Sequence, residues 1–154
     1  YTGVLLADTA VPAWKGARRE LPFLFASGAA ASAGAVASIL NPPADAVGAR
    51  RLAVGAVAAE LAVEQLLERR LGDVAEVFHQ GTAGQLFRAS KVCGAAGAVV
   101  VGLFGRRRAL AVAGGALVAT GAALTRFAVF EAGKASVRDP RYVVGPQRAA
   151  LSGT

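Results

Sequence analysis

The stretch that decides the fold is Leu21–Leu40, LPFLFASGAAASAGAVASIL. No ionisable side chain occurs between Glu20 and Asp45. At 1.5 Å per residue, residues 21–40 make roughly 30 Å of helix, which is the thickness of the hydrocarbon core of a bilayer. We therefore predict a transmembrane helix here. The alternative is a buried helix of a soluble protein.

Small residues in this stretch indicate how the helix packs. Ser27 with Ala31, and Gly28 with Ser32, form pairs of small residues four positions apart. Such pairs let two helix backbones approach closely inside a membrane. We therefore expect residues 21–40 to pack against other transmembrane helices.

The composition favours a polytopic membrane protein. The chain is 55% hydrophobic with a formal net charge of +7, and its Lys and Arg residues lie in short clusters between apolar runs. A nucleic-acid-binding protein would instead gather its basic residues on one face, so we expect no nucleic-acid partner. The chain has no Met and opens in an apolar run at Tyr1. We expect it to be the later part of a longer protein.

Cysteine and histidine are too few to build a redox centre. Cys93 lies in an apolar run and His79 in a polar stretch, and the chain has no other Cys or His. They cannot supply a disulfide framework, a Cys-ligated iron–sulfur cluster or a bis-His haem site. We interpret Cys93 as a small packed residue. His79 is expected to be solvated, with a proton relay as the alternative.

The remaining apolar runs predict an all-α fold, a polytopic transmembrane helical bundle with about four complete spans plus the end of a preceding one. Residues 1–13 form that preceding end, which Pro12 and Trp14 terminate. The further spans are 50–68, 86–105 and 109–131, and residues 136–154 form a polar C-terminal tail. Arg88 and Lys91 can extend toward the nearer membrane interface.

Three of the acidic residues within these spans are candidates for proton chemistry. Glu60 lies near the middle of span 50–68, with Glu64 one helical turn further on. A carboxylate at that depth costs roughly 2.5–3.5 kcal/mol, so we expect it to face other helices or water. The alternative is an amphipathic helix with a solvated acidic row. Asp8, in residues 1–13, is either an intramembrane acid or a group near the interface.

Basic residues suggest an ion pair and an orientation. Arg126 lies roughly 25 Å along the last span, near its far end, where it either pairs with a carboxylate or anchors at the interface. The side of the membrane that holds residues 15–19, 69–70, 88–91 and the tail carries more Lys and Arg than the side that holds residues 50–51 and 106–108. The positive-inside rule therefore predicts a cytoplasmic C-terminus in the cell membrane.

The polar groups at membrane depth suit quinol chemistry. No nucleophile elbow, phosphate-binding loop or metal-binding box is present in the sequence. A Tyr hydroxyl can donate a hydrogen bond to a quinone carbonyl, and an acid can accept or deliver the accompanying proton. The candidates are Tyr1 for quinone binding, Asp8, Glu60 and Glu64 for proton transfer, and Arg126 for charge pairing.

Three stretches, YTGVLLADTAVPAW (1–14), RRELPFLFASGAAASAGA (18–35) and LTRFAVFEAGKASVRDPRYVVGPQR (124–148), resemble the NrfD/PsrC (polysulfide reductase type) integral membrane subunits. The resemblance implies the later half of an eight-helix protein without a haem or iron–sulfur cluster of its own. Such subunits anchor an iron–sulfur subunit, often with a molybdopterin catalytic subunit, and exchange electrons with menaquinone or ubiquinone. We expect menaquinone here. Tyr1 is similar in position to the family's quinol-site Tyr, and Asp8 is the candidate for its proton-transfer acid.

The function we expect is that of a non-catalytic anchor subunit that exchanges electrons between the quinone pool and an iron–sulfur partner. Two other classes remain open. A proton or small-solute transporter would use Glu60 and Asp8 without a redox partner, and a purely structural anchor would use its polar groups only to hold helices together.

Overall fold

The computed structural model describes residue 5 and residues 9–71 and 80–138. Its helices are α2 (Pro12–Gly16), α3 (Leu21–Leu40), α4 (Val47–Leu71), α6 (Gly81–Phe104) and α7 (Arg108–Arg138). No strand occurs in the described ranges. The prediction of an all-helical fold is confirmed.

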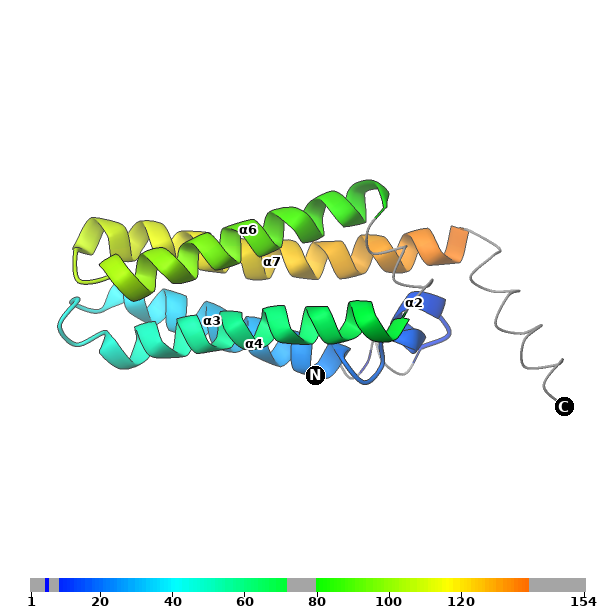
Figure 1. The fold of residues 1–154 in the computed structure, drawn as a ribbon, viewed down its shortest axis with the longest axis horizontal. Coiled ribbons are helices and arrows are strands. Elements are labelled where there is room, and N and C mark those ends of the chain that lie inside the picture. Colours follow the sequence, from blue (N-terminus) through cyan, green and yellow to red (C-terminus); the bar gives the residue numbers. More distant parts are fainter. Residues whose placement is uncertain (1–4, 6–8, 72–79, 139–154) are drawn as a thin grey trace, which may run out of the picture.

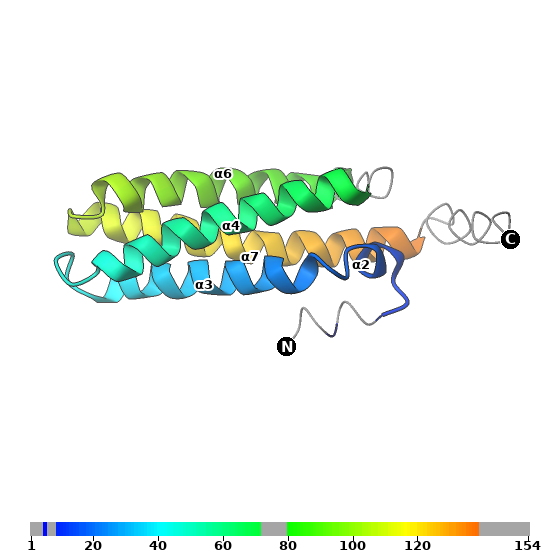
Figure 2. The same ribbon diagram turned by 60° about the horizontal axis from the view of Figure 1, so that its bottom comes forward.

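The long helices form an antiparallel bundle (Figure 1). Helix α3 packs against α4 and α7, and α6 packs against α7 and α4, so the four helices close into a ring. The short helix α2 lies beside the last turns of α7, as both ribbon views show (Figure 2). The connections 41–46 and 105–107 lie together at the end of the bundle opposite α2.

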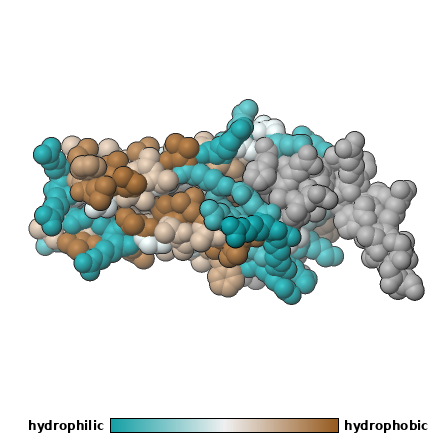
Figure 3. All heavy atoms as spheres, viewed as in Figure 1, coloured by the Kyte–Doolittle hydropathy of each residue, from teal (hydrophilic) through white to brown (hydrophobic). Residues whose placement is uncertain are grey.

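The outside of the bundle indicates a membrane protein. Helices α3, α6 and α7 are each long and apolar enough to cross a bilayer. Large apolar side chains on them point outward, among them Phe23 (67% exposed), Leu103 (72%) and Phe127 (62%). Figure 3 shows an apolar band on this face of the bundle, with hydrophilic surface toward both ends. Helix α4 is not among the three because it carries three glutamates in its second half and arginines near both ends.

Close backbone contact holds α3 against α4. A Cβ added at Gly34 would lie 2.6 Å from the Ala53 nitrogen and 2.8 Å from the Ala49 oxygen. Gly28 and Ala31, two of the small residues in the predicted pairs, are buried. The expected packing of residues 21–40 through small side chains is confirmed.

Helices α6 and α7 approach each other in the same way. A Cβ added at Gly97 would lie 2.7 Å from the Val118 nitrogen, and one at Gly121 would lie 2.8 Å from the Gly94 nitrogen. No larger side chain fits between backbones at these distances. Dispersion contacts between closely packed helices replace the hydrophobic effect, which does not drive association inside lipid.

Most helices extend beyond the predicted spans. Helix α3 has the predicted bounds, whereas α6 begins before residue 86 and α7 continues past residue 131 to Arg138. The added turns keep a buried face of small residues, such as Ala83 and Gly84 in α6 and Ala132 and Gly133 in α7. A span predicted from its apolar run stops where polar residues begin. The helix continues because one of its faces still packs.

The break near the N-terminus falls earlier than predicted. Residues 9–11 are irregular, and Pro12 is the first residue of α2, so Pro12 and Trp14 do not terminate a helix. Proline is favoured at a first helical position because its missing N–H has no partner there in any case. The Trp14 indole Nε1–H donates a hydrogen bond to the Val129 carbonyl at 2.9 Å, which attaches α2 to α7.

Candidate functional site

Two carboxylates of α4 lie inside the bundle. Glu60 is 7% exposed and Glu64 is 2% exposed. Among the residues that the structure describes, Glu60 Oε1 and Glu64 Oε2 have no hydrogen-bond partner. At these two positions the acidic face of α4 is therefore turned toward the other helices, as we expected. The alternative, a solvated acidic row, does not hold for Glu60 and Glu64.

Glu60 lies where three helices meet. A Cβ added at Gly28 of α3 would lie 3.1 Å from Glu60 Oε1 and 3.5 Å from Arg126 Nη1 of α7. The absence of a side chain at position 28 thus leaves room for both charged groups. Within the described ranges, the structure shows no direct ion pair between Glu60 and Arg126.

Contacts within the bundle hold Arg126 in place. Its Nη1 donates a hydrogen bond to the Ala122 carbonyl at 2.7 Å, and its guanidinium lies over the Phe25 ring, 5.8 Å from the centroid. Helix α7 continues to Arg138, so Arg126 lies well inside the helix and not near its end. Arg126 lies near the Glu60 carboxylate without forming an ion pair with it, and its anchoring at the membrane interface stays a prediction.

A second cluster joins α4 to α6. Lys91 Nζ lies 2.5 Å from Glu68 Oε1 and 3.8 Å from Glu64 Oε2. Lys91 therefore pairs with the acids of α4, and its reach toward the nearer membrane interface stays a prediction. The sequence analysis did not include Lys91 or Glu68 in the site. The signal that could have found them is a basic residue, Lys91, in an otherwise apolar part of α6, together with the acidic row of α4.

The acids continue to the end of the bundle near α2. Arg70, near the end of α4, forms an ion pair with Glu20, which precedes α3. Glu20 Oε2 is another buried oxygen without a hydrogen-bond partner in the described part of the chain. Glu60 lies about 20 Å along α4 from its first residue, Val47, and therefore near the middle of the helix. Acidic side chains thus occur at intervals from the interior of the bundle to one of its ends.

This arrangement can bind and transfer protons. Carboxylates one turn apart on a helix are close enough for a proton to pass between them directly or through water. Arg126 lies near Glu60, and the Lys91 Nζ lies 3.8 Å from Glu64 Oε2. Ionisable groups in such a position are costly and typically functional.

The other predicted residues contribute less to this site. Tyr1, Asp8 and His79 lie outside the described residues. Cys93 is a free, half-buried thiol in α6. In the described parts of the chain, no three His, Cys, Asp or Glu side chains gather in a way that could hold a metal ion. Compared with protein-family models, curated proteins and solved structures, the chain matches none of them.

Proposed function

We propose that this chain is the quinone-interacting membrane subunit of an oxidoreductase complex, which exchanges electrons between the quinone pool and an iron–sulfur partner subunit. The redox part of the proposal depends on the sequence resemblance at residues 1–14, 18–35 and 124–148. The buried acids support the part that concerns protons.

The observation that carries the proposal is Glu60. It is buried in the bundle, one of its carboxylate oxygens has no hydrogen bond among the described residues, and Arg126 lies nearby. An acid that only held helices together would be expected to bond with both oxygens, since an unsatisfied buried polar atom costs free energy. A free oxygen suits a group that gains and loses a proton.

A quinol, when bound, would supply electrons and protons together, because its oxidation releases both. The buried acids among the described residues are suited to accept those protons. Glu60 accepts or delivers a proton at Oε1, and Glu64 and Glu68 continue the row toward the end near α2. Tyr1 is proposed to bind the quinone carbonyl and Asp8 to take part in proton transfer.

The proposal also includes the topology. We assign α4 as a fourth span, because the outer faces of its neighbours are apolar and its own acids point inward. By the positive-inside rule, the excess of Lys and Arg at the α2 end supports a cytoplasmic location for that end, and we propose the same side of the cell membrane for the C-terminus. In this orientation the acidic row leads toward the cytoplasmic side. A molybdopterin catalytic subunit is the expected third component.

The test is to tag the full-length protein in its native membrane, extract it in mild detergent and assay the purified material for iron, acid-labile sulfide, molybdenum and quinone. Co-purification of metal-containing subunits with quinone is the expected result. Purified protein with neither metal nor quinone would contradict the proposal.

A proton or small-solute transporter is the second candidate. The observation that favours it is that one chain supplies every member of the row, so no partner protein is needed to complete it. The members are Glu60, Glu64, Glu68 and Lys91. This candidate predicts ion flux in liposomes that contain the chain alone, and loss of that flux in Glu60→Gln. Flux that needs a redox partner would exclude it.

A further inference from the structure

A groove lies on the outside of the bundle between the start of α3 and the end of α4. Its volume is about 660 Å³. Apolar side chains from both helices and arginines at the bundle end line it, and Glu20 completes the lining. The residues are Arg19, Phe23, Val63, Leu66, Arg69 and Arg70.

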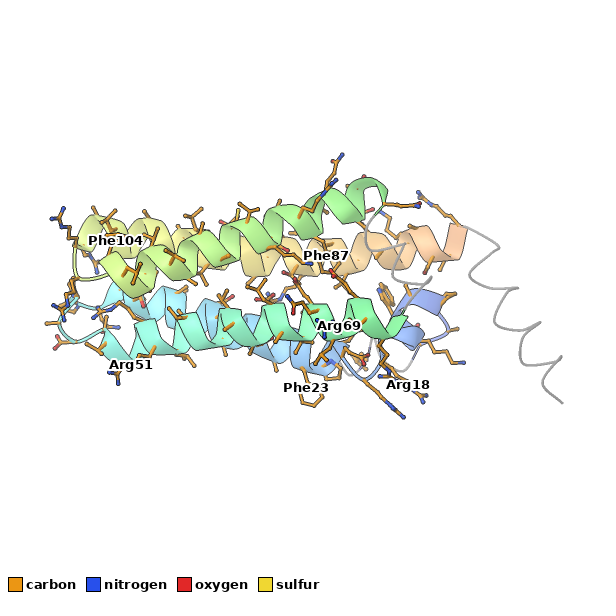
Figure 4. All side chains as sticks on the ribbon, in the orientation of Figure 1. Arg18, Phe23, Arg51, Arg69, Phe87 and Phe104 are labelled. Carbon is orange, nitrogen blue, oxygen red and sulfur yellow. The ribbon has the colours of Figure 1, made fainter. Side chains whose placement is uncertain are left out.

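The groove is positively charged at one end. Arg70 is neutralised by its ion pair with Glu20. Arg19 and Arg69 are exposed and form no ion pair with any residue that the structure describes. Among the described residues that line the groove, Arg19 and Arg69 thus carry positive charges that no ion pair neutralises. Figure 4 shows Arg18, Phe23 and Arg69 at this end, with the Phe23 ring pointing away from the bundle.

The rest of the groove is apolar and faces outward. Phe23 is 67% exposed and Leu66 is 59% exposed. Helix α3, which carries Phe23, is one of the helices able to span a membrane. With α4 as the proposed fourth span, we expect the groove to run from the membrane interface into the hydrocarbon region.

We propose that this groove binds an anionic phospholipid. Arg19 and Arg69 contact the phosphate, and an acyl chain lies along Phe23, Val63 and Leu66. A soluble anion would use only the arginines, and a zwitterionic lipid brings its own cation to the same place. Basic grooves between helices at the cytoplasmic side are suited to anionic headgroups. The inference depends on the membrane location of the bundle and not on the redox function.

Brominated lipids test this proposal through fluorescence quenching. The chain has one Trp, so Trp14→Phe gives a silent background into which Phe23→Trp places an indole in the groove. The full-length protein is reconstituted into phosphatidylcholine nanodiscs with a minor share of phosphatidylglycerol, and either lipid carries the bromine. Phe127→Trp, with similar exposure on α7, is the matched control.

Brominated phosphatidylglycerol is expected to quench the Phe23→Trp indole well beyond its share of the lipid. Each basic residue near an anionic headgroup is worth on the order of a fivefold preference, so Arg19→Gln with Arg69→Gln should abolish the excess. The Phe127→Trp indole should show none. Quenching in proportion to bulk lipid, an excess that survives both arginine substitutions, or displacement of the lipid by inorganic phosphate would overturn the proposal.

Discussion

At the residue scale, the site depends as much on missing side chains as on charged ones. Gly28 leaves the space in which Glu60 and Arg126 lie close to each other. Gly34 lets α3 contact the backbone of α4, so the acids of α4 are held near α3 and α7. Close packing and buried charge are thus two features of the same interface.

Gly34→Ala is therefore expected to destabilise the fold. The added methyl group would meet backbone atoms of Ala49 and Ala53, which cannot move without shifting a helix, and overpacking of this kind costs about 1–3 kcal/mol. Unfolding in a denaturing-detergent titration measures the loss. Gly55→Ala is the control, because nothing lies within 4 Å of a Cβ there. Equal losses in the two variants would contradict the packing.

Lys91→Gln is expected to destabilise the protein through Glu64 and Glu68. Removing the cation leaves two acids of α4 without their nearest positive charge, and breaking one side of a buried pair costs about 3–5 kcal/mol. The pair here is partly exposed, so we expect the lower part of that range or less. A double-mutant cycle with Glu68→Gln should show a coupling on the order of 1 kcal/mol. Strictly additive effects would argue against the contact.

At the element scale, α2 and the end of α7 form one unit. Trp14 bonds to the Val129 carbonyl and packs against Gly133. Because this is the only Trp of the chain, its fluorescence reports the contact directly.

Gly133→Val should displace the Trp14 indole, since a side chain at position 133 would occupy the volume of the ring. We expect a red-shifted emission and easier quenching by acrylamide. Gly48→Val, at a position with open space around it, serves as the control and should leave the emission unchanged. An unchanged spectrum in Gly133→Val would show that α2 does not pack there.

The elements themselves were largely predictable, and the contacts between them were not. The apolar run 21–40 has the length of its helix because ionisable Glu20 precedes it and Asn41-Pro42-Pro43 follows it. The ends of α6 and α7 were missed because a buried face of small residues continues where the apolar run stops. The pairing of Lys91 was not predicted, because sequence does not specify how far two antiparallel helices are shifted along each other. That shift brings its ammonium to Glu68.

Helix α4 is the element whose membrane location most needs testing. In a Cys93→Ser background, Gly55→Cys and Ala58→Cys place a thiol on its exposed face. Both thiols should resist a membrane-impermeant maleimide, because lipid covers that face if α4 spans the bilayer. Ala44→Cys, exposed in the connection 41–46, should react from one side of the membrane only. Reaction at residue 55 as fast as at residue 44 would place α4 in water.

At the scale of the whole molecule, an apolar exterior surrounds a row of acids that begins in the bundle interior and ends near α2. The apolar exterior indicates a membrane protein. Among the described residues, the buried carboxylate oxygens without a hydrogen bond support the proposal that Glu60 exchanges the proton that accompanies quinone chemistry.

The most direct test is quinone-linked turnover of the intact complex in native membranes, measured for Glu60→Gln and for Glu131→Gln. The control removes a carboxylate of α7 that pairs with Lys134 at 2.8 Å. We predict that Glu60→Gln lowers turnover on the order of 100-fold, as expected for loss of a proton-transfer group, while the complex keeps its subunits and metal. Glu131→Gln should behave as the parent protein. Normal turnover in Glu60→Gln, with only its stability reduced, would contradict the claim and identify Glu60 as a structural residue.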